Sequence, residues 1–163
     1  MTLAPLLRLL AAVLPVVAAG FLANLVTIPN IPTWYAGLVK PSFTPPNWVF
    51  GPAWALLYTL MAIAVWRILS MPAGTPGRGR ALLAFYGQLA LNALWSVAFF
   101  GMRSPSAGLV VILTLLAGIV LTILAFRPLD RLAAWLLAPY LAWVAYATAL
   151  TVAVWRLNPS GPG

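Results

Sequence analysis

Long, nearly unbroken runs of apolar residues dominate the chain, and short segments rich in Pro, Gly and Arg separate them. A helix needs about 20 apolar residues to cross the hydrocarbon core of a bilayer. Apolar positions do not alternate with polar ones over ten-residue stretches, as they would in a membrane barrel. We therefore predict an all-α membrane protein: a single domain over residues 1–163, folded as a five-transmembrane-helix bundle. The expected helices cover about residues 6–26, 48–69, 81–101, 106–126 and 132–155.

The first apolar run has some features of a signal peptide, because Arg8 precedes it and small residues occur near Gly20. The run continues to Val26, however, beyond the roughly 7–15 residues of a signal-peptide core. We therefore expect an uncleaved first helix.

Basic residues predict the orientation of these helices. Six lie at the amino end and in the second and fourth loops, and three lie elsewhere. Because Lys and Arg favour the cytoplasmic side, we expect the amino end in the cytoplasm and the first loop outside. The short carboxyl tail and the lack of a targeting peptide favour a bacterial cell membrane.

Composition supports a membrane protein and excludes several classes of function. Apolar residues make up 64% of the chain and charged residues 6%, against about 45–50% and 25% in soluble domains. There is no Cys and no His, and the one acidic side chain is Asp130. These absences exclude a disulfide scaffold, a thiol or Ser-His-Asp nucleophile, a paired-carboxylate site and a two-metal centre. The net charge of +8 comes from scattered basic residues, which favours membrane topology over nucleic-acid binding.

The connection between the first two expected helices, residues 27–47, is the most informative segment. Connections in helix bundles usually contain about 2–8 residues, whereas this one is longer, with five prolines and several aromatic residues. It is either a rigid lid at the mouth of the bundle or a loop whose Trp and Tyr anchor the membrane interface.

Residues in and after this loop resemble the signature of the TspO/MBR family of tryptophan-rich sensory proteins and translocator proteins, formerly called peripheral benzodiazepine receptors. The family pattern is Trp-Tyr, Leu, Lys-Pro, Pro-Pro, Trp-Val, Pro and Trp. The matching residues are Trp34, Tyr35, Leu38, Lys40, Pro41, Pro45, Pro46, Trp48, Val49, Pro52 and Trp54. The third and fifth expected helices are also similar, at Tyr86, Gly87, Gln88, Asn92, Trp95, Phe99, Phe100, Gly101, Pro139, Tyr140 and Trp143.

The resemblance implies a homodimer of five-helix bundles that binds tetrapyrroles such as protoporphyrin IX beneath the first loop. It also implies isoquinoline and benzodiazepine ligands and, for some members, sterols. Porphyrin transport, stress sensing and light-dependent porphyrin breakdown are the implied roles.

The third helix places Gln88, Asn92, Trp95 and Phe99 on one face. Buried amides often hold membrane helices together, and they can equally present donors and acceptors at the edge of an apolar cavity. Both interpretations remain open from spacing, and the resemblance makes Asn92 and Trp95 expected pocket residues.

On the fifth helix, Tyr140, Trp143, Ala147 and Leu150 share a face. Ala147 leaves space between large rings, and the resemblance implies that this small position lines the pocket. Pro139 should bend the helix near its start.

The remaining candidates lie near the expected mouth. Aromatic rings suit a planar macrocycle, and Lys40 is the cation best placed to meet propionates. Without His or Cys to ligate iron, we expect metal-free porphyrin or haem without strong axial ligation, and no cofactor or metal. The expected ligand-binding residues are Trp34, Lys40, Trp54, Tyr58, Asn92, Trp95, Tyr140, Trp143 and Ala147.

The leading hypothesis is a non-enzymatic membrane protein that binds porphyrin, or another apolar planar molecule, in transport or sensing. One alternative is light-dependent porphyrin degradation that uses pocket Trp residues. Sterol transport is disfavoured because Val152 stands where the cholesterol pattern before Arg156 needs Tyr. An ion-coupled transporter is disfavoured because no charged residue lies mid-span. The expected partners are the ligand, the lipid bilayer and a second copy of the chain.

Overall fold

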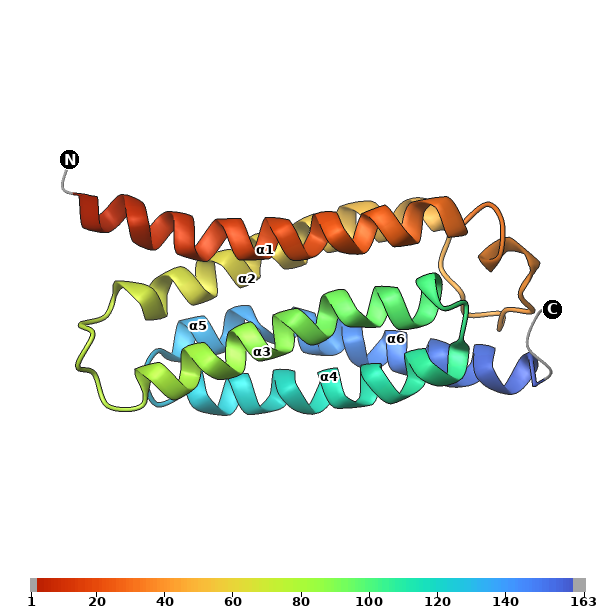
Figure 1. Ribbon diagram of the computed structural model, residues 1–163. Helices are drawn as coiled ribbons and strands as arrows, with labels where there is room; N and C mark the ends of the chain where they lie inside the picture. The colour runs from red at the N-terminus through yellow and green to blue at the C-terminus, as the bar shows by residue number, and fades with distance from the viewer. Residues whose placement is uncertain (1–2, 160–163) are drawn as a thin grey trace.

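The computed structural model describes residues 3–159, and its helices run side by side along one axis (Figure 1). Five helical segments are long and apolar enough to cross a membrane, which confirms the predicted architecture. Short 3-10 turns η1 and η2 lie in the first loop, and a π-helical turn, η3, follows α3. The elements are α1 (Leu3–Asn30), η1 (Tyr35–Gly37), η2 (Asn47–Val49), α2 (Phe50–Ser70), α3 (Arg78–Ser96), η3 (Val97–Gly101), α4 (Pro105–Phe126), α5 (Arg131–Leu136) and α6 (Ala138–Leu157).

Two helices differ from their expected bounds. Helix α1 continues through Pro29 to Asn30, so the first loop begins four residues later than predicted. Proline removes only its own N–H donor, and the amide of Ile31 still donates to the carbonyl of Thr27 at 3.2 Å. The fifth span is interrupted at Leu137, between α5 and α6, two residues before the Pro139 at which a bend is expected.

The end of α3 widens into the π turn η3. The amide of Met102 donates to the carbonyl of Val97 at 2.8 Å, and that of Ser104 donates to Phe99 at 3.2 Å. These bonds reach five residues back along the chain instead of four. As a result, the consecutive side chains of Phe99 and Phe100 are both buried, with 3% and 8% of their surface exposed.

The helices form a ring whose order in space differs from their order in the sequence. Helix α1 packs against α2 and α3, α3 packs against α4, and α4 packs against α6. The ring is completed by α2, which packs along α5 but makes few contacts with α6. The first loop and the carboxyl end of α6 lie at the same end of the bundle, and the amino end of α1 lies at the other (Figure 1).

The buried side chains form two groups. The larger fills the half of the bundle around Met61, Ile68, Phe85 and Phe126. The smaller lies at the loop end, at Trp34, Tyr35, Leu38, Phe99, Phe100 and Val154. A partly open cavity lies at the loop end, where exposed residues of α1 and α2 such as Phe21 and Ala55 border it.

Candidate functional site

A cavity of about 600 Å³ lies inside the bundle toward the loop end. This volume falls within the range of roughly 300–1,000 Å³ that is typical of small-molecule pockets. Helices α1, α2, α3 and α6, the turn η3 and the first loop all contribute to its wall. The lining residues are Val17, Gly20, Phe21, Ala23, Asn24, Thr27, Ile28, Ile31, Tyr35, Asn47, Phe50, Gly51, Trp54, Ala55, Tyr58, Asn92, Trp95, Ser96, Phe99, Phe100, Trp143, Ala147, Leu150, Thr151 and Val154.

The first loop covers one end of this cavity. Its aromatic side chains pack against η3 and hold the loop in place. Trp34 and Tyr35 keep 8% and 5% of their surface exposed. The Trp34 ring meets Phe99 edge-on, with centroids 5.4 Å apart, and Tyr35 lies 5.7 Å from Phe100. Burial, and then the nearby Tyr146, raise the pKa of Tyr35, so its phenol is neutral at physiological pH. The geometry therefore favours the lid over the interface anchor.

Polar contacts tie the loop to itself and to α6. The Lys40 ammonium donates to the carbonyls of Tyr35 at 2.8 Å, Leu38 at 2.9 Å and Ala36 at 3.3 Å. It also lies 4.9 Å from the centre of the Tyr35 ring. Lys40 is thus used inside the loop and is not part of the cavity wall, contrary to the expectation that it meets the ligand at the mouth.

Two further ties join the loop to α6. Asn158 accepts from the amide of Val39 at 3.1 Å and donates to the carbonyl of the same residue at 3.0 Å. The hydroxyl of Tyr146 donates to the carbonyl of Phe43. Hydrogen bonds therefore hold the first loop against the fifth span.

A chain of buried hydrogen bonds forms the floor of the cavity. The Tyr58 hydroxyl donates to Asn92 Oδ1 at 2.9 Å, and Asn92 Nδ2 donates to the Tyr140 hydroxyl at 3.1 Å. The Tyr140 hydroxyl donates in turn to Gln88 Oε1 at 2.9 Å. These hydrogen bonds join α2, α3 and α6. The amides of Gln88 and Asn92 therefore hold the helices together, which is the first of the two interpretations left open by the sequence. Asn92 also lines the cavity, so it serves both purposes.

Aromatic rings make up much of the wall. Trp54 stacks on Tyr58 with centroids 5.2 Å apart, and Trp95 stacks on Phe99 at 5.5 Å. Among the described residues, the buried indole nitrogen of Trp95 has no hydrogen-bond partner. The residue lines the cavity, but this nitrogen atom has almost no accessible surface and does not face the open space.

Six of the nine expected ligand-binding residues line the cavity: Trp54, Tyr58, Asn92, Trp95, Trp143 and Ala147. Three do not. Trp34 lies behind Phe99, Lys40 is held by loop carbonyls, and Tyr140 is fully buried behind Asn92.

Sequence reasoning missed the contribution of α1, which adds seven lining residues between Val17 and Ile28. Two polar residues in this part of the first apolar run could have indicated that the helix faces a cavity. Asn24 and Thr27 follow Gly20 at four and seven residues, on one helical face. An added Cβ at Gly20 would lie 2.8 Å from Tyr58 Cε2, so the glycine lets the Tyr58 ring approach α1 closely.

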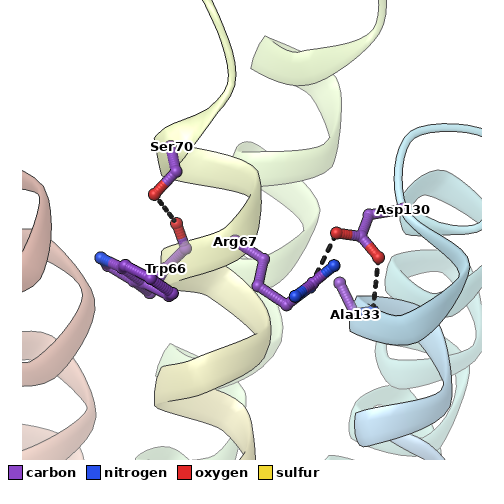
Figure 2. Close-up of polar contacts among 5 residues, drawn as sticks. All are labelled: Trp66, Arg67, Ser70, Asp130 and Ala133. Atoms are coloured by element: carbon purple, nitrogen blue, oxygen red, sulfur yellow. Dashed lines mark hydrogen bonds and ion pairs between the residues drawn. The ribbon is translucent and has the colours of Figure 1, made fainter.

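The chain's one carboxylate lies at the opposite end of the bundle. Arg67 Nε donates to Asp130 Oδ2 at 2.7 Å, and Asp130 Oδ1 accepts from the amide of Ala133 at 3.0 Å (Figure 2). Partial burial alone would raise the pKa of Asp130, but the Ala133 amide and the Arg67 guanidinium outweigh it and hold this pKa below its ordinary value. Asp130 therefore caps α5 and joins it to α2.

The cavity wall is suited to binding an apolar molecule. It contains no Asp, Glu, Lys or Arg, and the chain has no His or Cys. Tyr35 and Tyr58 are the titratable side chains on the wall. The wall offers large rings, amides and hydroxyls, which suit a planar apolar molecule with a few polar atoms.

Comparison with known proteins places the whole bundle in context. The TspO/MBR family description matches residues 11–156. The chain is 44% identical over 153 residues to a tryptophan-rich protein TspO of Archaeoglobus fulgidus, covering 94% of this chain and 98% of the relative. It is 43% identical over 126 residues to a translocator protein of Homo sapiens, covering 77% and 75%. It is also 40% identical over 129 residues to a tryptophan-rich sensory protein of Cereibacter sphaeroides, covering 79% of each chain.

Proposed function

Because this chain belongs to the TspO/MBR family and is a multi-pass membrane protein, we propose that it binds tetrapyrroles of the protoporphyrin IX type. The cavity beneath the first loop is the proposed site, and porphyrin transport or stress sensing is the proposed role. The observation that carries the proposal is a cavity walled by Trp54, Trp95 and Trp143, with hydrogen-bonding groups on its floor. Flat rings stack favourably on such walls.

Protoporphyrin IX titration of the purified protein tests the proposal, with Trp fluorescence as the readout. Ala147→Leu places a larger side chain in the cavity and should weaken binding by roughly tenfold. Asn92→Ala and Trp143→Phe should weaken it less, because each removes only part of the floor or wall. Ala149→Leu, on the exposed face of α6 and outside the lining, is the matched control.

Saturable quenching that Ala147→Leu weakens and Ala149→Leu leaves unchanged would support the cavity as the site. Equal, unsaturable quenching in all variants would mean that porphyrin only partitions into the micelle. The search should then turn to other apolar ligands.

Light-dependent porphyrin degradation is the second candidate, favoured by the three Trp rings on the cavity wall. Illumination of the complex in the presence of oxygen tests it through the absorption spectrum. Loss of the porphyrin bands faster than in free ligand, and slower in Trp143→Phe, would support degradation. Identical rates with and without protein would exclude it.

The distribution of charge also supports one orientation of the bundle in the membrane. Arg67 and Asp130 lie at the same end of the bundle as the amino end of α1, and the other basic residues of the second and fourth loops accompany them. We infer that this end faces the cytoplasm. Because the chain has no Cys, single cysteines at Gly74 and Phe43 can be labelled from one side of a sealed vesicle to test the inference.

The bundle is further proposed to form a homodimer through α3. Leu83 and Leu94 on this helix are 76% and 49% exposed, and no atom lies within 4 Å of a Cβ added at Gly87. Small residues on an exposed helical face allow close packing between membrane helices. A single cysteine at Gly87 that forms no disulfide in the membrane would contradict this interface.

A further inference from the structure

The cavity has an open side between α1 and α2, near the loop end. The two helices run in opposite directions (Figure 1) and touch at one level, where a Cβ added at Gly20 would lie 2.8 Å from the Tyr58 ring. Gly51, nearer the loop, also lines the cavity, yet no atom lies within 4 Å of a Cβ added to it. Phe21 and Ala55 line the same side and are exposed. Because both helices are long and apolar enough to span the membrane, the opening between them faces the bilayer.

Three polar side chains lie on this open side. Asn24 and Thr27 line the cavity from α1, and Asn47 lines it from the start of the second span. Asn24 and Asn47 are exposed, and Thr27 is half-buried. Residues 9–29 of α1 carry no other polar side chain. The polar positions of an apolar helix therefore coincide with the edge of the cavity.

These three side chains are free to bond with another molecule. Within residues 3–159, the amides of Asn24 and Asn47 and the hydroxyl of Thr27 form no hydrogen bond. Other threonines on membrane-spanning helices do: Thr59 and Thr114 donate to the carbonyls four residues earlier, at 2.8 and 2.9 Å. A polar group without a partner is unfavourable in hydrocarbon, where no water replaces the missing bond. The opening thus presents donors and acceptors that a ligand can satisfy.

The chemistry of this group suits a carboxyl. No charged side chain lines the cavity. Lys40 is held by three loop carbonyls, and Arg103 donates to Asn30 Oδ1 at 3.2 Å. An amide or a hydroxyl both donates and accepts, so a set of them can bond both oxygens of a carboxyl group without a cation.

We propose that Asn24, Thr27 and Asn47 form a polar rim that binds the carboxyl groups of a planar apolar acid, while its macrocycle lies among the rings inside. This inference rests on the proposed function and adds the side chains that select the ligand. A macrocycle without carboxyl groups would leave the rim unpaired. Sites built to hydrogen-bond a ligand group discriminate against analogues that lack it, because their own polar groups then lose their partners.

Two porphyrins test the rim: protoporphyrin IX, which carries propionates, and etioporphyrin, which carries alkyl groups instead. Trp fluorescence follows each titration of the protein in nanodiscs of phosphatidylcholine. Asn24→Leu, Asn47→Leu and Thr27→Val remove the hydrogen-bonding groups at similar size. Each should weaken protoporphyrin IX binding by roughly three- to tenfold and leave etioporphyrin binding equal or tighter. Thr114→Val, at an exposed position of α4 outside the cavity wall, is the matched control and should change neither.

Thr27→Ser keeps the hydroxyl and should bind both porphyrins as wild type does, whereas a loss as large as in Thr27→Val would contradict the role of the hydroxyl. An equal loss of both porphyrins in the rim variants would overturn the proposal, because these residues would then only shape the cavity. Unchanged protoporphyrin IX affinity in all three would also overturn it and assign the polar groups to water or lipid headgroups. Wild-type protein that binds neither porphyrin saturably would instead refute the proposed function, and the rim with it.

Discussion

Gly108 on α4 packs against Phe99, which forms the roof of the cavity. Its replacement by alanine should change the free energy of unfolding in a defined direction. An added Cβ would lie 2.7 Å from Phe99 Cδ2 and 2.9 Å from Phe99 Cβ, well inside the roughly 3.5–4.0 Å of a favourable carbon contact. The Phe99 ring has little room to retreat. It stacks on Trp95 at 5.5 Å, and its centroid lies 4.9 Å from that of Phe100.

Two opposing effects determine the expected change in stability of Gly108→Ala. Alanine in a helix is favoured over glycine by about 0.5–1 kcal/mol, whereas overpacking costs about 1–3 kcal/mol. Gly87→Ala, measured on the monomer in detergent so that the proposed dimer interface is not involved, is the matched control on α3, because no atom lies within 4 Å of its added Cβ. The control should therefore keep the full gain, and the two variants should differ by about 1–3 kcal/mol.

Thermal unfolding in detergent, followed by circular dichroism, measures this difference. Gly108→Ala should melt below wild type and Gly87→Ala at or above it, separated by roughly 2–10 °C. Gly108→Ala should also weaken protoporphyrin IX binding, because Phe99 lines the cavity. If Gly108→Ala melted as high as Gly87→Ala, Phe99 would be free to move, and the account of a rigid roof would be refuted.

Three further substitutions address the floor, the wall and the distal end. Tyr140→Phe leaves Gln88 and Asn92 without their shared partner and should cost about 0.6–2 kcal/mol in chemical unfolding; an unchanged midpoint would contradict the buried chain. Gly20→Ala should push the Tyr58 ring away from α1 and weaken porphyrin binding severalfold in titration, and unaltered affinity would show that the ring adapts. Because the Asp130 pKa is lowered in the fold, its contribution to stability is complete above the ordinary pKa of about 3.9 and is lost as pH falls through the folded value. Asp130→Asn should lower stability by about 1 kcal/mol at neutral pH and abolish that acid-dependent loss in melting experiments.

The architecture followed from the sequence because membrane spans are fixed by physical limits that act locally. A run of apolar residues long enough to cross the bilayer must form a helix, since its backbone groups find no water to bond. Helical spacing then placed Asn92, Trp95, Trp143 and Ala147 on inward faces, and the structure puts all four on the cavity wall.

The details that sequence could not give depend on contacts between distant segments. The π turn at Val97–Gly101 brings both Phe99 and Phe100 inward, and no local pattern announces it. Lys40 was expected at the mouth because it carries the loop's charge, yet three nearby carbonyls hold it. The contribution of α1 was visible only as Asn24 and Thr27 in an apolar run, which helix packing alone could have explained.

The uncharged wall of the cavity has a consequence for how the protein responds to an energised membrane. Each elementary charge that crosses a potential of 100 mV changes the free energy by about 2.3 kcal/mol. No charged side chain lines the cavity. Motion of the cavity wall is therefore electrically silent, and any dependence of porphyrin binding on the membrane potential has to come from the propionates of the ligand.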